Sequence, residues 1–387
     1  MMFGTLALIS LIAVLGPLLA LPKRWHVPVV VGELIAGIAV GPMGFDVLDA
    51  QNVTLTFLAQ IGFALVMFVA GSHVPVHDPH LRAGIRVGAV RAIAVGAIAA
   101  VLGVLLAQVF HTGHAGLYAV LMASSSAALI LPIVSSMRLG GVPVLQLLPQ
   151  VAIADTACIV ALPLVIDPRH AARAAIGTLV VLASAACLYL LLLYLERSGL
   201  RRSAHRISDE RKFALELRMN LAVLFGLSAL AVATGVSIML AGFAFGVAVA
   251  LVGEPRRLAR QLFAVTEGFL APLFFVWLGA SLDLGELLRR PGFIVLGLAL
   301  GVGAVVAHVA MRLLGQPVSM GAMASAQLGV PVAAATVGAE LHVLAPGEPA
   351  ALILGALVTI AVTAVAGSAA LRSGFVAPDR RAHRVDR

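Results

Sequence analysis

The stretch IAGIAVG, residues 35–41, recurs as LAGFAFG at residues 240–246, about 205 residues further along the chain. A longer stretch, GFALVMFVAGS at 62–72, recurs loosely as GFLAPLFFVWLGAS at 268–281 when a small gap is allowed. A third pair keeps an offset of about 200 residues: SSSAALILP, which contains Pro132, and QLGVPVAAATVG, which contains Pro331. Three matches in the same order predict that the chain consists of two related halves.

The composition places both halves in a membrane. Of the 387 residues, 61% are hydrophobic and only 11% are charged, and the mean hydropathy is +1.06. A soluble domain carries roughly 25% charged residues, so this chain could not cover a soluble surface. The 38 glycines favour close contacts between membrane helices through small residues. We therefore expect an all-α polytopic membrane protein.

The hydropathy pattern predicts about 13 transmembrane helices of about 20 residues each. If the first six repeat as the last six, the seventh is a linker helix, and the two copies cross the membrane in opposite directions. Many secondary transporters are built from such an inverted-topology repeat. The apolar segments are 2–21, 28–45, 53–72, 84–110, 115–137, 142–166, 174–195, 213–234, 236–252, 262–281, 292–313, 317–341 and 350–372.

The distribution of basic residues predicts the orientation. With the C-terminus in the cytoplasm, only four of the 26 Lys and Arg residues fall in outside loops: Arg169, Arg173, Arg289 and Arg290. The basic cluster at 196–212 and the tail then lie inside, as the positive-inside rule requires. We expect a multi-pass protein of the plasma membrane, with the N-terminus outside and the C-terminus cytoplasmic. The net charge of +8 is thus a topology signal and does not indicate nucleic-acid binding.

The two matched prolines predict interruptions at equivalent places in the two halves. A proline inside a helix removes one backbone hydrogen bond and clashes with the preceding turn. Irregular backbone at membrane depth survives where it is buried in protein or lines a cavity. We therefore expect helix breaks around 124–132 and 327–331 that meet near the membrane centre, although simple kinks would also fit. The residues assigned to these breaks are Ser124, Ser125, Ser126, Pro132, Gln327, Gly329 and Pro331.

One carboxylate lies deep in an apolar segment. Asp155 stands about twelve residues into 142–166, and its counterpart in the second half falls near Ile360, which is uncharged. A charge at bilayer depth is costly and usually functional. Such a group has two low-cost forms, protonated or ionised with a cation bound. We expect Asp155 to bind a proton and a cation in turn, with Thr156 and Ser124 to Ser126 as oxygen ligands, against the alternative of a structural hydrogen bond to a helix break.

Other polar residues carry weaker signals. Glu33, a second acid near membrane depth, is expected to have a structural or interfacial role near the cytoplasmic end of its helix. Cys158 and Cys187 lie in apolar segments, so we expect neither a disulfide nor a metal site. No cofactor is expected. No nucleophile and base, and no metal-ligand set, lie together at membrane depth, so an enzyme is not expected.

Five motifs follow one another along the chain: GELIAGIAVGPMGFD (32–46), MASSSAALILPIVSS (122–136), ADTACIVALPLV (154–165), SIMLAGFAFGVAVA (237–250) and GFLAPLFFVWLGASLDL (268–284). In this order and spacing they resemble the monovalent cation:proton antiporters, in the branch of sodium/proton exchangers and potassium-efflux antiporters. The resemblance covers about residues 5–372 and implies two crossed discontinuous helices. It implies dimerisation helices in 1–80 and 212–288, a core in 82–166 and 292–372, a linker at 174–195, a cytoplasmic tail at 373–387 and a homodimer.

Within this resemblance, Asp155 matches the essential ion-binding aspartate of the family, and two departures affect the expected activity. Ala154 stands where electrogenic members carry a second acid, which implies electroneutral exchange. The second break reads Gln327, Leu328, Gly329, Val330, and lacks the basic residue and the Gly-Glu pair often found there.

We therefore expect exchange of H+ for Na+ or K+ by alternating access at a single buried aspartate, and the sequence does not choose between the two cations. Two rivals stay open: a sodium-coupled symporter of an organic anion on a similar scaffold, and a non-transporting membrane sensor or regulatory paralogue. The lost charges in the second break favour the sensor slightly.

Overall fold

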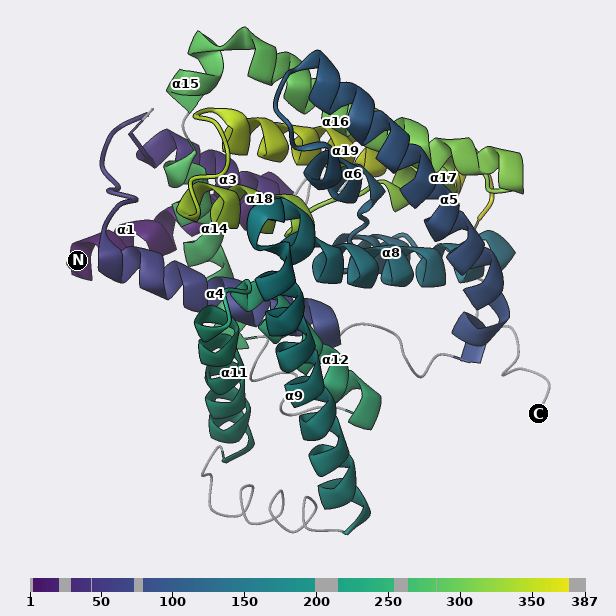
Figure 1. Ribbon diagram of the computed structural model, residues 1–387, viewed down its shortest axis with the longest axis horizontal. Helices are drawn as coiled ribbons and strands as arrows, with labels where there is room; N and C mark the ends of the chain where they lie inside the picture. The colour runs from purple at the N-terminus through teal and green to yellow at the C-terminus, as the bar shows by residue number, and fades with distance from the viewer. Residues whose placement is uncertain are drawn as a thin grey trace. The chain divides into compact units, whose positions relative to one another are not determined.

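A computed structural model describes residues 3–20, 29–42, 44–72, 79–198, 215–253, 264–282 and 284–375. Every regular element in these ranges is helical (Figure 1). Nine helices of this part of the chain are long and apolar enough to cross a membrane, and three shorter apolar helices lie at Phe3–Leu18, Val29–Val40 and Ile238–Val252. The expected class, an all-α polytopic membrane protein, is confirmed. The lysines and arginines of 199–212 and residues 376–387 of the tail lie outside the described residues.

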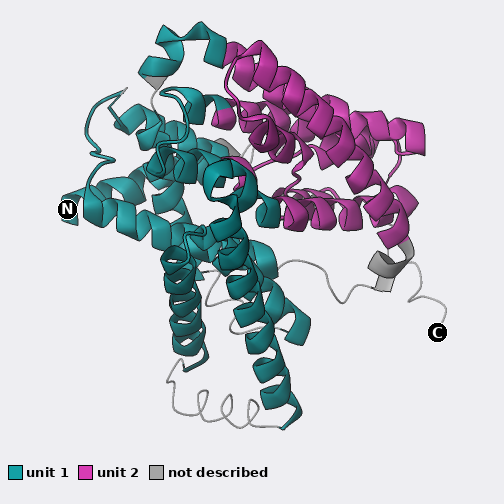
Figure 2. Cartoon of the chain, viewed as in Figure 1, with its two compact units in different colours: residues 1–77, 159–293, 332–351 teal, residues 78–158, 294–331, 352–387 magenta. Residues whose placement is uncertain are grey.

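The chain divides into two compact units, which Figure 2 colours separately. Unit 1 comprises Met1–His77, Ile159–Phe293 and Val332–Ala351. Its helices include one π-helical segment, Thr266–Leu270, that leads into α14. Within it, α9 and α11 run side by side (Figure 1). The helices are α1 (Phe3–Ala13), α2 (Leu15–Ala20), α3 (Val29–Val40), α4 (Val53–Ser72), α9 (Ala171–Arg197), α11 (Leu215–Ala233), α12 (Ile238–Val252), α14 (Ala271–Ser281) and α15 (Leu284–Arg289).

The repeated glycine motif sets the packing inside unit 1. Gly37 in α3 and Gly242 in α12 are the central glycines of the two copies, and α3 packs against α14 while α12 packs against α4. A Cβ atom at Gly37 would overlap the carbonyl oxygen of Val276, and one at Gly242 would overlap that of Ala64. The motif is therefore used twice in the same way, because only glycine lets these backbones approach so closely.

We expect Gly242→Ala to destabilise the protein by about 1–3 kcal/mol, because the added methyl group must push α12 away from the Ala64 carbonyl. Gly226→Ala, on α11, is the matched control, since a Cβ there would meet nothing within 4 Å. Thermal unfolding in detergent should show a lower midpoint for Gly242→Ala only. Equal midpoints for the two variants would contradict this account of the packing.

Unit 2 comprises Asp78–Cys158, Ile294–Pro331 and Leu352–Arg387. Its elements follow one order twice: a long helix, a helix broken into two halves, and a second long helix. Four helices, α8, α16, α18 and α19, continue past the boundary of the unit, so each contributes residues to both units. The helices are α5 (Pro79–Val109), α6 (Ala115–Ala123), α7 (Ala127–Ser136), α8 (Val142–Ile166), α16 (Pro291–Val309), α17 (Val318–Ala324), α18 (Gly329–Glu340) and α19 (Glu348–Arg372).

The interruptions lie a few residues before the prolines that were expected to mark them. The first separates Ala123 from Ala127, and the second separates Ala324 from Gly329. Pro132 is the sixth residue of α7 and is not part of the first break, and Pro331 is the third residue of α18. The first turn of a helix has no internal partners for its N–H groups, so Pro331 costs no hydrogen bond there. Serine at the first break instead offers the backbone a competing side-chain partner.

Candidate functional site

Asp155 lies on α8 and is 5% exposed. Its Oδ2 atom accepts a hydrogen bond from the backbone N–H of Ala127 at 3.0 Å. Ala127 is the first residue of α7, so the carboxylate lies at the positive end of this half-helix. The buried acid and the first helix break therefore form one arrangement inside unit 2.

The three serines of the first break are all buried. Ser124 Oγ donates to the carbonyl of Leu121, at the end of α6, at 2.8 Å. Ser125 Oγ donates to the carbonyl of Ala324, the last residue of α17, at 2.6 Å. Ser126 lies between Ser125 and the start of α7 and is 3% exposed. The first break thus makes a direct contact with the end of the half-helix that precedes the second break.

The second break makes the corresponding contact with the half-helix that precedes the first break. The side-chain Nε2 of Gln327, which is itself buried, donates to the carbonyl of Leu121 at 2.6 Å. Each break therefore donates from a neutral side chain to the carbonyl end of the opposite half-helix. Those two helix ends carry partial negative charge, and the hydrogen bonds from the Ser125 hydroxyl and the Gln327 amide partly neutralise it.

Two residues of this arrangement were missed by the sequence reasoning. Thr359 Oγ1, on α19, accepts from the backbone N–H of Gln327 at 3.2 Å. His308, on α16, is 1% exposed, and its Nε2 lies 3.3 Å from Ser125 Oγ. The only sequence signal for either is a single polar residue in an apolar segment, LVTIAV for Thr359 and VVAHVA for His308.

The other expected site residues have different surroundings. Thr156, next to Asp155, is exposed, and Gly329 and Pro331 lie in the first turn of α18. Glu33 is 4% exposed in α3 and belongs to unit 1. The structure therefore brings Asp155, Ser125, Gln327 and their partners together, and Glu33 belongs to a different set of helices.

Asp167, the next carboxylate after Asp155, shows how a carboxylate outside the spans is held. It follows the last residue of α8, and its Oδ2 lies 2.7 Å from His170 Nδ1. The hydrogen bond from His170 lowers the pKa of Asp167. Asp167 therefore has a side-chain partner that favours its ionised form, whereas Asp155 accepts its hydrogen bond from the backbone N–H of Ala127.

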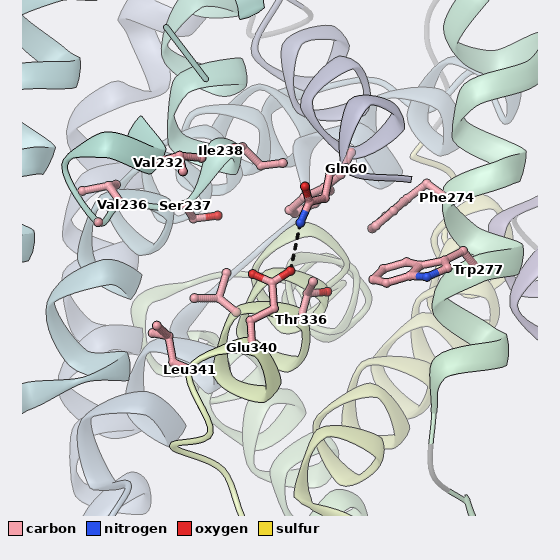
Figure 3. A pocket seen from close by; sticks show the side chains of 13 residues that line it. Gln60, Val232, Val236, Ser237, Ile238, Phe274, Trp277, Thr336, Glu340 and Leu341 are labelled. Carbon is pink, nitrogen blue, oxygen red and sulfur yellow. Dashed lines mark hydrogen bonds between the residues drawn. The ribbon is translucent and has the colours of Figure 1, made fainter. Parts of the chain in front are cut away.

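Unit 1 contains a separate pocket of about 220 Å³. Figure 3 shows Gln60 of α4 and Glu340 of α18 pointing toward one another, with Phe274 and Trp277 of α14 on the pocket wall. Gln60 Nε2 donates to Glu340 Oε1 at 3.1 Å. Apart from this pair the lining is mostly apolar, and none of the expected site residues lines it.

The chemistry of the unit 2 arrangement suits a small hard cation. It offers a carboxylate, serine hydroxyls and the carbonyls that end two half-helices, which are the oxygen groups that coordinate ions in discontinuous membrane helices. Within the residues described, no group of three His, Cys, Asp or Glu could hold a metal ion, and Cys158 and Cys187 are both free.

Known proteins are similar to this chain over most of its length. The transmembrane sodium/hydrogen exchanger family matches residues 10–373. The probable Na(+)/H(+) antiporter 3 of Methanocaldococcus jannaschii is 25% identical over 89% of this chain and 90% of its own length. The putative Na(+)/H(+) antiporter YjbQ of Bacillus subtilis is 25% identical over 94% of this chain. The chain spans 62% of the length of the Bacillus protein.

The potassium-efflux branch and a solved structure are also similar. The glutathione-regulated potassium-efflux protein KefC of an Enterobacter species is 27% identical over 68% of this chain, which spans 42% of KefC. The solved sodium proton antiporter MjNhaP1 of Methanocaldococcus jannaschii superposes with a TM-score of 0.68 at 19% identity, over 95% of this chain and 97% of that one. The superposition supports the fold, and the family match extends over nearly the whole chain. The chain belongs to the sodium/hydrogen exchanger family.

Proposed function

We propose that this protein is a monovalent cation:proton antiporter that works by alternating access, with Asp155 as the shared binding site. The observation that carries the proposal is a buried carboxylate at the start of a half-helix, beside two breaks that contact each other. The family is one of cation and proton transporters, and the relatives named above are antiporters or efflux systems.

The mechanism follows from the two forms of Asp155. When the carboxyl group carries a proton, it is neutral and has no attraction for a cation. When it loses the proton, its charge and the hydroxyl groups of Ser124, Ser125 and Ser126 bind a cation. Because one carboxylate holds one ligand at a time, exposing it alternately to the two sides exchanges a proton for a cation.

The surroundings of Asp155 favour electroneutral exchange. Ala154, the preceding residue, is apolar, and the second break contributes the neutral residues Gln327 and Thr359. One proton therefore moves for each monovalent cation, and no net charge crosses the membrane. The proposal covers either Na+ or K+, since curated relatives of both kinds match the chain.

We further propose that the protein works as a homodimer through helices in 1–80 and 212–288, with its transport core in 82–166 and 292–372. The N-terminus lies outside and the C-terminus in the cytoplasm of a plasma membrane. The support for this orientation is the excess of Lys and Arg in the loops assigned to the inside.

The deciding experiment is proton flux in proteoliposomes. Vesicles loaded with a pH dye are given a proton gradient, and sodium, potassium or lithium is then added outside. Cation-dependent proton movement supports the proposal, and the cation with the lowest half-saturating concentration is the substrate. No flux with any of the three, in protein shown to be folded and inserted, would overturn it and favour a regulatory role.

We expect the exchange to carry no current. A rapid cation jump over proteoliposomes on a solid-supported membrane should change the internal pH without a transient charge movement, because one charge replaces another. An empty-vesicle jump provides the baseline. A current that reverses with the direction of the cation gradient would contradict one-for-one exchange.

A further inference from the structure

The two helix breaks are each anchored from a neighbouring long helix. At the first, the backbone N–H of Ala127 donates to Asp155 on α8 at 3.0 Å. At the second, the backbone N–H of Gln327 donates to the hydroxyl of Thr359 on α19 at 3.2 Å. In both cases a side-chain oxygen takes up a backbone donor that the interruption has released from its helix.

The positions of these residues follow the internal repeat. Gln327 lies 200 residues after Ala127, and Thr359 lies 204 residues after Asp155. Both separations fall close to the offset of about 205 residues between the repeated glycine motifs. Thr359 therefore occupies, in the second half of the chain, the place that Asp155 occupies in the first.

The chemistry of the two anchors differs in one respect. Thr359 is fully buried, and its hydroxyl accepts from Gln327 and donates to the carbonyl of Ala356 at 2.8 Å. The hydroxyl therefore makes one hydrogen bond as acceptor and one as donor within the protein. A threonine hydroxyl can therefore anchor the break without ionising, whereas a carboxyl group changes its charge when it gains or loses a proton.

We propose that Thr359 is the second-half counterpart of Asp155: a positioning residue that anchors the second break and keeps the crossing limited to one carboxylate. The inference rests on the proposed exchange at Asp155. Thr359 acts through Gln327, whose side chain contacts the carbonyl end of α6 at Leu121. A loose second break would therefore disturb the first break as well.

Three substitutions test the proposal. Thr359→Val keeps the shape but removes the acceptor for the Gln327 N–H, so turnover should fall at least ten-fold, and Thr359→Ser should restore it. Thr363→Val is the matched control. Thr363 lies one turn further along α19 and is also buried, and its hydroxyl donates to the Thr359 carbonyl, within the same helix. Wild-type turnover in folded Thr359→Val, or equal losses in Thr359→Val and Thr363→Val, would overturn the anchoring role.

Thr359→Asp tests the limit to one carboxylate. It places a second carboxylate at the equivalent position, so two protons should move for each cation. With the membrane potential held at zero, one pH unit then supports a cation gradient of about 100-fold, against about ten-fold for one-for-one exchange. An unchanged ten-fold gradient in active Thr359→Asp would overturn this part.

Two further results complete the test. If Thr359→Asp does not fold, the Thr359→Val and Thr359→Ser pair still decides the anchoring role. If wild-type vesicles show no cation-dependent proton flux, the proposed exchange itself fails. The inference about Thr359 fails by itself in a different way: the wild-type protein exchanges ions, and Thr359→Val exchanges them at the same rate.

Discussion

Asp155→Asn is expected to abolish cation-dependent proton flux, with a loss of at least 100-fold, while the protein still folds. The asparagine side chain keeps an oxygen that can accept from the Ala127 N–H, so the anchor of α7 is preserved. It can neither release a proton nor carry a negative charge. The substitution thus removes the exchange chemistry and leaves the structural hydrogen bond, which separates the two explanations for this residue.

The measurement is the proteoliposome assay together with thermal unfolding in detergent. Asp155→Ala should lose both flux and stability, by about 1–3 kcal/mol, because it leaves the buried Ala127 N–H without an acceptor. Asp167→Asn is the control carboxylate, since Asp167 lies outside the spans and pairs with His170. Cation-dependent flux at wild-type rates in Asp155→Asn would assign Asp155 a purely structural role.

Gln327→Leu is expected to have the second-largest effect, because it cuts the contact that runs from the second break to the end of α6. The leucine has a similar volume but no donor, so the buried carbonyl of Leu121 loses the 2.6 Å hydrogen bond from Nε2. Because that carbonyl still accepts from Ser124 Oγ, the cost is that of one hydrogen bond, about 0.5–1.5 kcal/mol. We expect that loss of unfolding free energy and at least a ten-fold fall in turnover.

Gln60→Leu is the matched control for this substitution. Gln60 also donates through its side-chain amide, but its partner is Glu340 in the pocket of unit 1. The two variants should be compared by unfolding midpoint and by initial rate at saturating cation. Full stability and full turnover in Gln327→Leu would show that the reciprocal contact between the breaks is dispensable.

Much of the fold could be predicted because it depends on features that recur along the chain. Hydropathy identified the membrane class, since lipid demands long apolar segments regardless of how they pack. The recurrence of the Gly37 and Gly242 motifs predicted two related halves, and the same close approach to a neighbouring backbone explains both glycines. The prolines were a poorer guide: they predicted that two helices are interrupted, but Pro132 lies inside a regular half-helix.

The sequence by itself determined that Asp155 is a candidate site residue, because an acid stands out in an apolar segment whatever surrounds it. Only the tertiary structure decided what that acid and the two breaks contact. The decisive bonds join residues far apart in the chain: Asp155 to Ala127 across 28 positions, Ser125 to Ala324 across 199, and Gln327 to Leu121 across 206. Hydrophobicity and charge belong to single residues and can be read one at a time. A hydrogen bond depends on the distance between two atoms. For residues far apart in the chain, the packing of the helices sets that distance.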